Sequence, residues 1–176
     1  MAEALEEWGV VGAGGAGFPA DVKLKARAEV VIVNAAECEP LLHKDKELIL
    51  HESRAMLAGL RMAMERVEAS RAVVGIKEKY ADVIRALSTE LPGDVKVQPL
   101  TDTYPAGDEF ILVYDVLGRV IPPGGLPLHV GAVVNNVETL VNLGHAFQAL
   151  GKEEEAHATW SRAVEADPTL AGAYFQ

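Results

Sequence analysis

The chain has 176 residues, of which 49% are hydrophobic, enough for one ordinary domain with a packed core. Its 16 lysines and arginines are outnumbered by 26 aspartates and glutamates, which gives a formal net charge of −10. This balance argues against a nucleic-acid or anionic-membrane surface, because such surfaces need a dense basic face. The sequence has neither an apolar run of about 20 residues nor the features of a signal peptide, so we expect a cytoplasmic protein.

Cysteine and histidine usage argues against a metal site. Cys38 is the only cysteine, so one chain cannot form a disulfide, a thiolate zinc site or a cysteine-ligated iron–sulfur cluster. The histidines show no metal-ligand spacing. We therefore predict no metal, and we expect Cys38 to be a small buried side chain rather than a nucleophile.

The first distinctive segment follows a short predicted helix at residues 2–8. The run from Gly9 to Lys23, GVVGAGGAGFPADVK, places five glycines within nine positions. Glycine reaches positive φ and lets backbone N–H groups approach an anion, so the run predicts a phosphate cradle. A G-x-G-x-x-G dinucleotide fingerprint competes with this interpretation, although Pro19 opposes an immediate helix. A glycine-rich turn without a ligand is the third possibility.

Strand and helix signals then alternate along the chain. Short runs rich in valine and isoleucine predict buried strands at residues 29–34, 71–76 and 95–99. Apolar periodicity predicts helices at residues 45–69, 80–91 and 108–117. This alternation predicts an α/β fold, a mostly parallel sheet with helices on both faces. Ligands of such sheets bind in loops at the carboxyl ends of strands, which here are the glycine run and residues 34–40 and 100–107.

Four motifs, in order, carry a family resemblance. They are VVGAGGAGFP with Lys23, VIVNAAECEPLLHKDKEL, TYPAGDEFILVY and RVIPPGGLPLHVGAVVNNVETL. Over about residues 4–145 the chain resembles the FMN-binding domain shared by the C subunit of the Rnf electron-transport complex, the cobalamin reductase of propanediol utilisation and the proline-reductase-associated electron carrier. More distantly it resembles the FMN- and NADH-binding flavoprotein subunit of respiratory complex I. The resemblance implies a Rossmann-like FMN-binding domain of the complex I flavoprotein type.

The resemblance also implies roles for particular residues. Glycines 12, 14, 15 and 17 would line the flavin and nicotinamide, Phe18 would shape the wall, and Lys23 would pair with the FMN phosphate. Acidic or loop residues on the NADH side would be Glu37, Glu39, Tyr104, Gly107, Asp108 and Glu109. The remaining FMN contacts would come from Asn34, Asn135, Asn136 and Thr139. The four glycines expected to line the flavin and nicotinamide are Gly12, Gly14, Gly15 and Gly17.

The implied chemistry is hydride transfer from NADH to FMN, with electrons then passed to a partner protein or subunit. The protein would position the cofactors and supply electrostatics, with no catalytic residue beyond that. The electron acceptor stays open. The protein could be peripheral to a membrane complex through such partners, and no nucleic-acid partner is expected.

The same residues permit simpler interpretations when the resemblance is set aside. Glu37, Glu39, Asp108 and Glu109 could be solvated acids or helix N-terminal charges. Lys23 could be a surface residue. The pair Asn135-Asn136 before a helix is an N-cap signal.

The C-terminal part departs from the family. The reductases continue into a β-rich domain and a cysteine-rich iron–sulfur segment, neither of which we expect here. Residues 137–170 instead resemble one 34-residue tetratricopeptide repeat, which predicts a helical hairpin. We therefore expect an FMN/NADH-binding domain at residues 1–136 and a hairpin with the start of a further helix at residues 137–176. The hairpin could contact a second copy or another protein, and the alternative function is a non-catalytic scaffold that uses this surface.

Overall fold

The computed structural model describes residues 23–39 and 41–166, with only the helical backbone for residues 152–166. The predicted helix at residues 2–8 and the glycine run up to residue 22 therefore lie outside the described residues. The C-terminal residues 167–176 lie outside them too.

Within the described residues four parallel strands form a sheet, in the order β3-β2-β1-β4. They are β1 (Val30–Ala35), β2 (Arg71–Lys77), β3 (Val95–Leu100) and β4 (Ala132–Asn136). The first three confirm the predicted strands. The fourth, β4, was not predicted, and it is a short apolar run that pairs with β1 and is followed at once by a helix.

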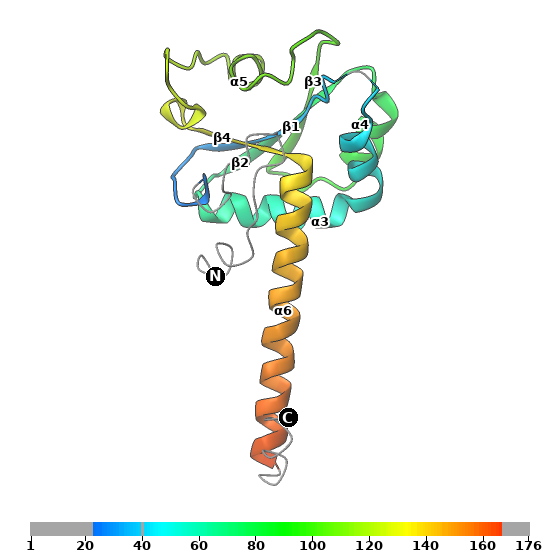
Figure 1. Ribbon diagram of the computed structural model, residues 1–176, viewed down its shortest axis with the longest axis vertical. Helices are drawn as coiled ribbons and strands as arrows, with labels where there is room; N and C mark the ends of the chain where they lie inside the picture. The colour runs from blue at the N-terminus through cyan, green and yellow to red at the C-terminus, as the bar shows by residue number, and fades with distance from the viewer. Residues whose placement is uncertain (1–22, 40, 167–176) are drawn as a thin grey trace.

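Helices cover both faces of the sheet, as predicted (Figure 1). α3 (Lys44–Arg66) connects β1 to β2, and α4 (Ala81–Ser88) connects β2 to β3. The connection from β3 to β4 contains α5 (Glu109–Leu117) and the 3-10 turn η1 (Pro127–Val130). α5 lies on the opposite face from α3 and from α6 (Val137–Ala166), the last helix of the described residues.

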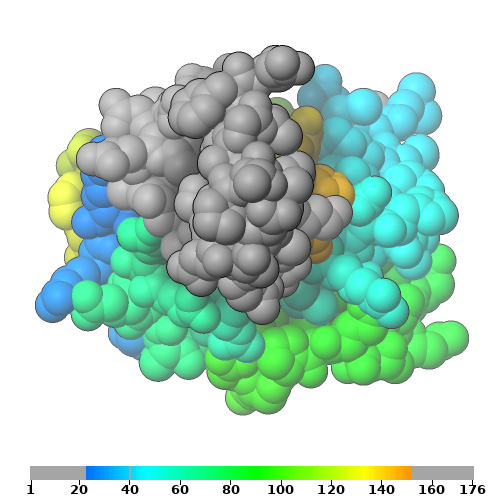
Figure 2. Space-filling view, turned by 90° about the horizontal axis from the view of Figure 1, so that it is seen from below, coloured from blue at the N-terminus to red at the C-terminus, as the bar shows by residue number. Residues whose placement is uncertain are grey.

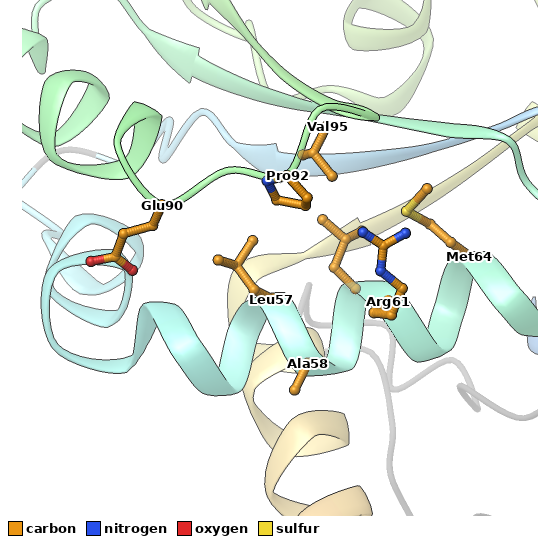
Figure 3. Close-up of a pocket in the computed structure, with 8 residues that line it drawn as sticks. Leu57, Ala58, Arg61, Met64, Glu90, Pro92 and Val95 are labelled. Atoms are coloured by element: carbon orange, nitrogen blue, oxygen red, sulfur yellow. The ribbon is translucent and has the colours of Figure 1, made fainter.

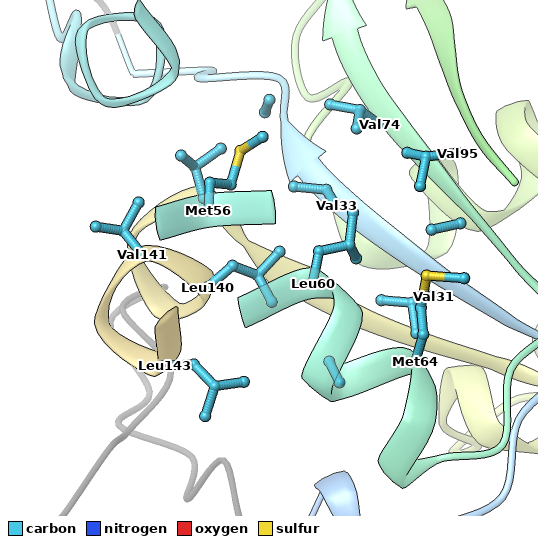
Figure 4. Close-up of a cluster of buried hydrophobic side chains, with 14 of the residues drawn as sticks. Val31, Val33, Met56, Leu60, Met64, Val74, Val95, Leu140, Val141 and Leu143 are labelled. Atoms are coloured by element: carbon cyan, nitrogen blue, oxygen red, sulfur yellow. The ribbon is translucent and has the colours of Figure 1, made fainter. Parts of the chain in front are cut away.

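Alternation along the strands divides the core into two layers. Val31 and Val33 of β1 pack in the layer that contains α3 and α6, whereas Val30 and Ile32 pack in the layer that contains α5. Figure 4 shows the first layer, where Leu60 of α3 lies between β1 and α6. Because successive strand residues point to opposite faces, a continuous Val/Ile run is required to fill both layers.

Two glycines bring α3 and α6 into close contact. A Cβ atom at Gly59 of α3 would overlap the carbonyl oxygen of Leu140, and one at Gly144 of α6 would overlap that of Ala55. The backbones of the two helices therefore touch where they cross. Seen from below in Figure 2, α3, in cyan shades, spreads across this face next to the orange residues of α6.

The predicted C-terminal hairpin is wrong, because α6 is one continuous helix from Val137 to Ala166 (Figure 1). Gly151 lies inside this helix and does not interrupt it. One glycine costs a helix only about 1 kcal/mol, and the strong helix formers in KEEEAHA, residues 152–158, follow it. Among the described residues no helix is long and apolar enough to cross a membrane. The division at residue 136 stays a prediction.

Replacing the crossing glycine should destabilise the protein strongly. Gly144→Ala would force α6 away from α3, and we expect a loss of about 3 kcal/mol or more in the free energy of unfolding. Gly151→Ala is the matched control, because it lies in the same helix with no atom within 4 Å of an added Cβ. It should stabilise the protein by up to about 1 kcal/mol. Urea denaturation followed by circular dichroism measures both, and equal effects would contradict the close crossing.

Candidate functional site

The sheet reverses its direction of winding between β1 and β4. From β1 the chain moves outward to β2 and β3, then crosses to the other side of β1 to form β4. At their carboxyl ends Asn34 of β1 is paired with Asn136 of β4. The helices that follow β1 and β4, α3 and α6, lie on one face of the sheet, and α5, which follows β3, lies on the other. Open α/β sheets bind ligands at the strand carboxyl ends where the strand order reverses, and we call this end of the β1–β4 pair the crevice.

Polar side chains line the junction between β4 and α6. Asn135 is buried, with 6% of its surface exposed, and Thr139 is buried with 2% exposed. The Asn136 carboxamide oxygen accepts hydrogen bonds from the Thr139 backbone N–H, at 3.0 Å, and from the Thr139 hydroxyl. Asn136 therefore caps α6, as its position before the helix indicated.

Lys23 lies against β4. Its ammonium group donates a hydrogen bond to the Val134 carbonyl oxygen at 2.8 Å, and its side chain is half-buried. Burial lowers the pKa of Lys23, and the negative charge of Glu109 partly opposes that shift. Lys23 is thus more than a surface lysine, since it places a positive charge at the crevice.

The loop after β3 brings an acidic helix N-terminus to the same place. Asp108 caps α5, with one carboxylate oxygen accepting from the backbone N–H groups of Phe110 and Ile111 at 3.0 and 3.2 Å. Glu109 is the first residue of α5 and is half-buried. Burial raises the pKa of Glu109, the charge of Lys23 lowers it, and the charge of Asp108 raises it. The charges of Glu109 and Lys23 affect each other's pKa, so the N-terminus of α5 lies near Lys23.

Asn34 connects the β1 loop to the β3–α5 loop. Its side-chain N–H donates to the Gly107 carbonyl oxygen at 2.8 Å, and its side-chain oxygen accepts from the Ala36 backbone N–H at 3.2 Å. The loop after β3 therefore crosses the carboxyl end of β2, which lies between β3 and β1, and reaches β1.

Glu37 and Glu39 differ in their surroundings. Glu37 has a positive φ of 41°, and one of its carboxylate oxygens accepts a hydrogen bond from the Asp45 backbone N–H at 3.0 Å. It therefore satisfies an N-terminal donor of α3, where His43 supplies no side-chain cap. The other oxygen of Glu37 is buried and has no hydrogen-bond partner within the described residues. Glu39 is exposed.

The structure thus gathers most of the described residues predicted for the site, but not all of them. Those that meet around the crevice are Lys23, Asn34, Gly107, Asp108, Glu109, Asn135, Asn136 and Thr139. Tyr104, in the loop after β3, is 81% exposed. The predicted Gly12, Gly14, Gly15, Gly17 and Phe18 lie outside the described residues.

Sequence reasoning missed two features near the site. An ion pair of 2.6 Å joins Lys44 of α3 to Glu138 of α6. Beside it, burial and the charge of Glu37 raise the pKa of Asp45 to about 6. The KDKEL motif contains both Lys44 and Asp45, but nothing in its spacing pointed to Glu138, 94 residues away from Lys44.

A separate hollow lies at the opposite edge of the sheet. It has a volume of about 340 Å³ and is bounded by α3, the loop after α4 and the start of β3 (Figure 3). Its lining includes Leu57, Met64, Pro92 and Val95. The Arg61 and Asp94 side chains form a two-point ion pair at 2.6 and 3.0 Å, which joins α3 to the loop before β3. Because this hollow faces away from the strand carboxyl ends, we separate it from the crevice. The described part of the chain holds no group of three potential metal ligands.

Comparison with known proteins gives consistent matches. Residues 5–145 match the family described as the Nuo51 FMN-binding domain. Cobalamin reductase PduS of Citrobacter freundii is 44% identical over 146 residues, 83% of this chain and 32% of that protein. The C subunit of the proton-translocating ferredoxin:NAD(+) oxidoreductase complex of Clostridium ljungdahlii is 39% identical, over 82% of this chain and 33% of that protein.

A solved structure gives the same result. The chain is similar to an air-oxidized NAD+-reducing NiFe-hydrogenase, with a TM-score of 0.71 and 28% identity, over 82% of this chain and 29% of that one. The chain spans about a third of the length of these relatives. No comparison supports the tetratricopeptide resemblance.

Asp45 should make stability depend on pH. Its folded-state pKa of about 6 lies above its ordinary value of 3.8, so the folded protein binds this proton more tightly than the unfolded chain does. The stability that the folded protein gains from the bound proton is lost as the pH rises from about 4 to about 6. Asp45→Asn removes the charge, and above pH 6 it should stabilise the protein by up to about 3 kcal/mol, since one pKa unit equals about 1.4 kcal/mol. The gain should vanish near pH 4.

Denaturation series at pH 4.5 and 7.5 measure this difference. The control is Asp82→Asn, which removes an exposed acid from the first turn of α4. A gain for Asp45→Asn that does not depend on pH would show that the buried charge is not its source.

Proposed function

The chain belongs to the Nuo51 FMN-binding domain family, and from this premise we propose that FMN binds in the crevice between β1 and β4. The observation that carries this proposal is the meeting of three separate segments at one point. Lys23, the carboxyl ends of β1 and β4 and the N-terminus of α5 all contribute polar side chains there. The crevice is also the switch point of the sheet, where this class of fold binds nucleotides.

The side chains present fit a flavin mononucleotide. Carboxamides such as those of Asn34 and Asn135 offer both donors and acceptors, as the polar edge of a flavin ring requires. Lys23 supplies a positive charge suited to a phosphate, although it now bonds the Val134 carbonyl oxygen. In the sequence, Gly12, Gly14, Gly15 and Gly17 stand a few residues before Lys23, which supports a phosphate cradle next to it.

We further propose that NADH delivers the electrons. FMN, when bound, supplies the hydride-accepting chemistry. The chain's own contribution is the acidic α5 N-terminus, where half-buried Glu109 would repel the 2′-phosphate that distinguishes NADPH. Glu37, by contrast, already bonds the N-terminus of α3, so Glu109 is the better candidate for this selectivity.

The electron acceptor is proposed to lie outside this sequence. A cysteine-ligated cluster needs more thiolates than the single Cys38 can provide. Relatives of this chain include a subunit of an electron-transfer complex, which supports a protein partner as the acceptor.

Loss of the Lys23 charge should weaken FMN binding. We expect Lys23→Gln to cost about 1 to 3 kcal/mol, the value of a charge-assisted hydrogen bond to phosphate. Lys25→Gln is the control, because it removes an exposed lysine two residues away. Quenching of flavin fluorescence during titration measures both. Absence of binding by the parent protein would refute the proposed function, and equal affinities of the two variants would remove Lys23 from the site.

Glu109 should set the preference for NADH. With FMN saturating, we expect the parent protein to be reduced faster by NADH than by NADPH. In Glu109→Gln the kcat/KM for NADH divided by that for NADPH should fall roughly tenfold, because one repulsive charge is lost. Glu90→Gln, at the distant hollow, is the matched control. Anaerobic stopped-flow bleaching of the flavin gives the rates. An unchanged ratio would assign selectivity to another residue.

A further inference from the structure

Gly107 is held on both sides by side chains from the end of β1 and from the loop that follows it. Its carbonyl oxygen accepts a hydrogen bond from the Asn34 side chain at 2.8 Å, and its N–H donates to the Cys38 sulfur at 2.9 Å. These partners lie 73 and 69 residues before Gly107 in the sequence. The N–H belongs to the peptide before Gly107 and the carbonyl to the peptide after it, so the two hydrogen bonds restrict both peptides that flank this residue.

The fit around Gly107 is also close. A Cβ atom there would lie 3.1 Å from the Cys38 sulfur, 3.3 Å from the Ala36 Cβ and 3.4 Å from the Asn34 side-chain oxygen. A residue larger than glycine would therefore push the two loops apart. The preceding residue, Ala106, is buried with 1% exposed, so the core holds the loop from its other side.

The orientation of Asn34 is itself determined. Its side-chain oxygen accepts from the Ala36 backbone N–H, which leaves the nitrogen to face the Gly107 carbonyl oxygen. The reversed amide would place two donors together at one end and two acceptors at the other. Asn34 therefore connects its own loop to the β3–α5 loop in one defined geometry.

The clamped residue directly precedes the acidic helix N-terminus. Asp108 follows Gly107 and caps α5, and Glu109 is the first residue of that helix. A peptide that is fixed immediately before a helix fixes where the helix begins. The position of the Glu109 carboxylate relative to Lys23 therefore depends on the contacts that hold Gly107.

We propose that Asn34 and Cys38 are positioning residues, which clamp Gly107 through the peptides on its two sides and thereby hold Asp108 and Glu109 at the nucleotide side of the crevice. The part of this inference that concerns nucleotide rests on the proposed function. Cys38 acts here through its sulfur as a hydrogen-bond acceptor, with no redox or nucleophilic step. Asn34 holds the loop, in addition to any contact with a flavin.

Substitutions of Cys38 test the clamp. Cys38→Ala removes the acceptor, whereas Cys38→Ser keeps one on a side chain of similar size. In the parent protein the Gly107 amide should be protected from hydrogen exchange. We expect its exchange to become roughly tenfold faster or more in Cys38→Ala and to stay near the parent rate in Cys38→Ser. Nuclear magnetic resonance of the labelled protein, which needs no cofactor, measures this rate.

Kinetics test the consequence for nucleotide. In Cys38→Ala the KM for NADH should rise several-fold, while FMN affinity and kcat stay close to parent values, and Cys38→Ser should restore the KM. Unchanged exchange of the Gly107 amide in Cys38→Ala would overturn the clamp. Faster exchange with an unchanged KM would overturn its positioning role.

The two proposals can fail separately. If the parent protein binds no FMN, the proposed function is refuted, but the exchange rates still decide whether the clamp exists. In that case the Glu109 pKa, raised by burial in the parent, reports the positioning. It should fall toward its ordinary value in Cys38→Ala and not in Cys38→Ser, and an unchanged Glu109 pKa in Cys38→Ala would overturn the inference.

Discussion

The whole arrangement depends on β1 being paired in parallel on both of its edges. β2 lies on one side and β4 on the other, so the chain must reverse its winding at β1. The reversal places the crevice at the carboxyl ends of β1 and β4, where the chain that leaves β3 brings α5 in from the face opposite α3 and α6. Asn34 and Asn136 are placed side by side by the register of this pairing. The polar contacts of the candidate site follow from that register.

The contact between α3 and α6 holds this end of the sheet in place. α6 begins directly after β4, and Asn136 both ends the strand and caps the helix. Because Gly59 and Gly144 let the two backbones touch, the first half of α6 is fixed against the helix that follows β1. The Lys44–Glu138 ion pair joins the starts of the same two helices. Packing that is distant from the crevice therefore determines the positions of its asparagines.

The sequence predicted the parts of the fold that have a strong local pattern. Continuous Val/Ile runs identified β1, β2 and β3, and the parallel sheet with helices on both faces is confirmed. β4 was missed because AVVNN is short and its last residue already belongs to a helix cap. The hairpin was wrong because it rested on the tetratricopeptide resemblance alone, whereas residues 137–166 form one helix whose Gly144 contacts α3. The hydrogen bond between Cys38 and Gly107 joins residues 69 positions apart, and no local pattern encodes such a contact.

Ligand binding at the crevice between β1 and β4, and not at the hollow beside β3, is the central claim. Chemical-shift changes in isotopically labelled protein on addition of FMN test this claim most directly. We predict the largest changes at residues 34–39, 106–109 and 134–139. Changes centred on the hollow, near Leu57, Arg61 and Val95, or no changes at all, would contradict it.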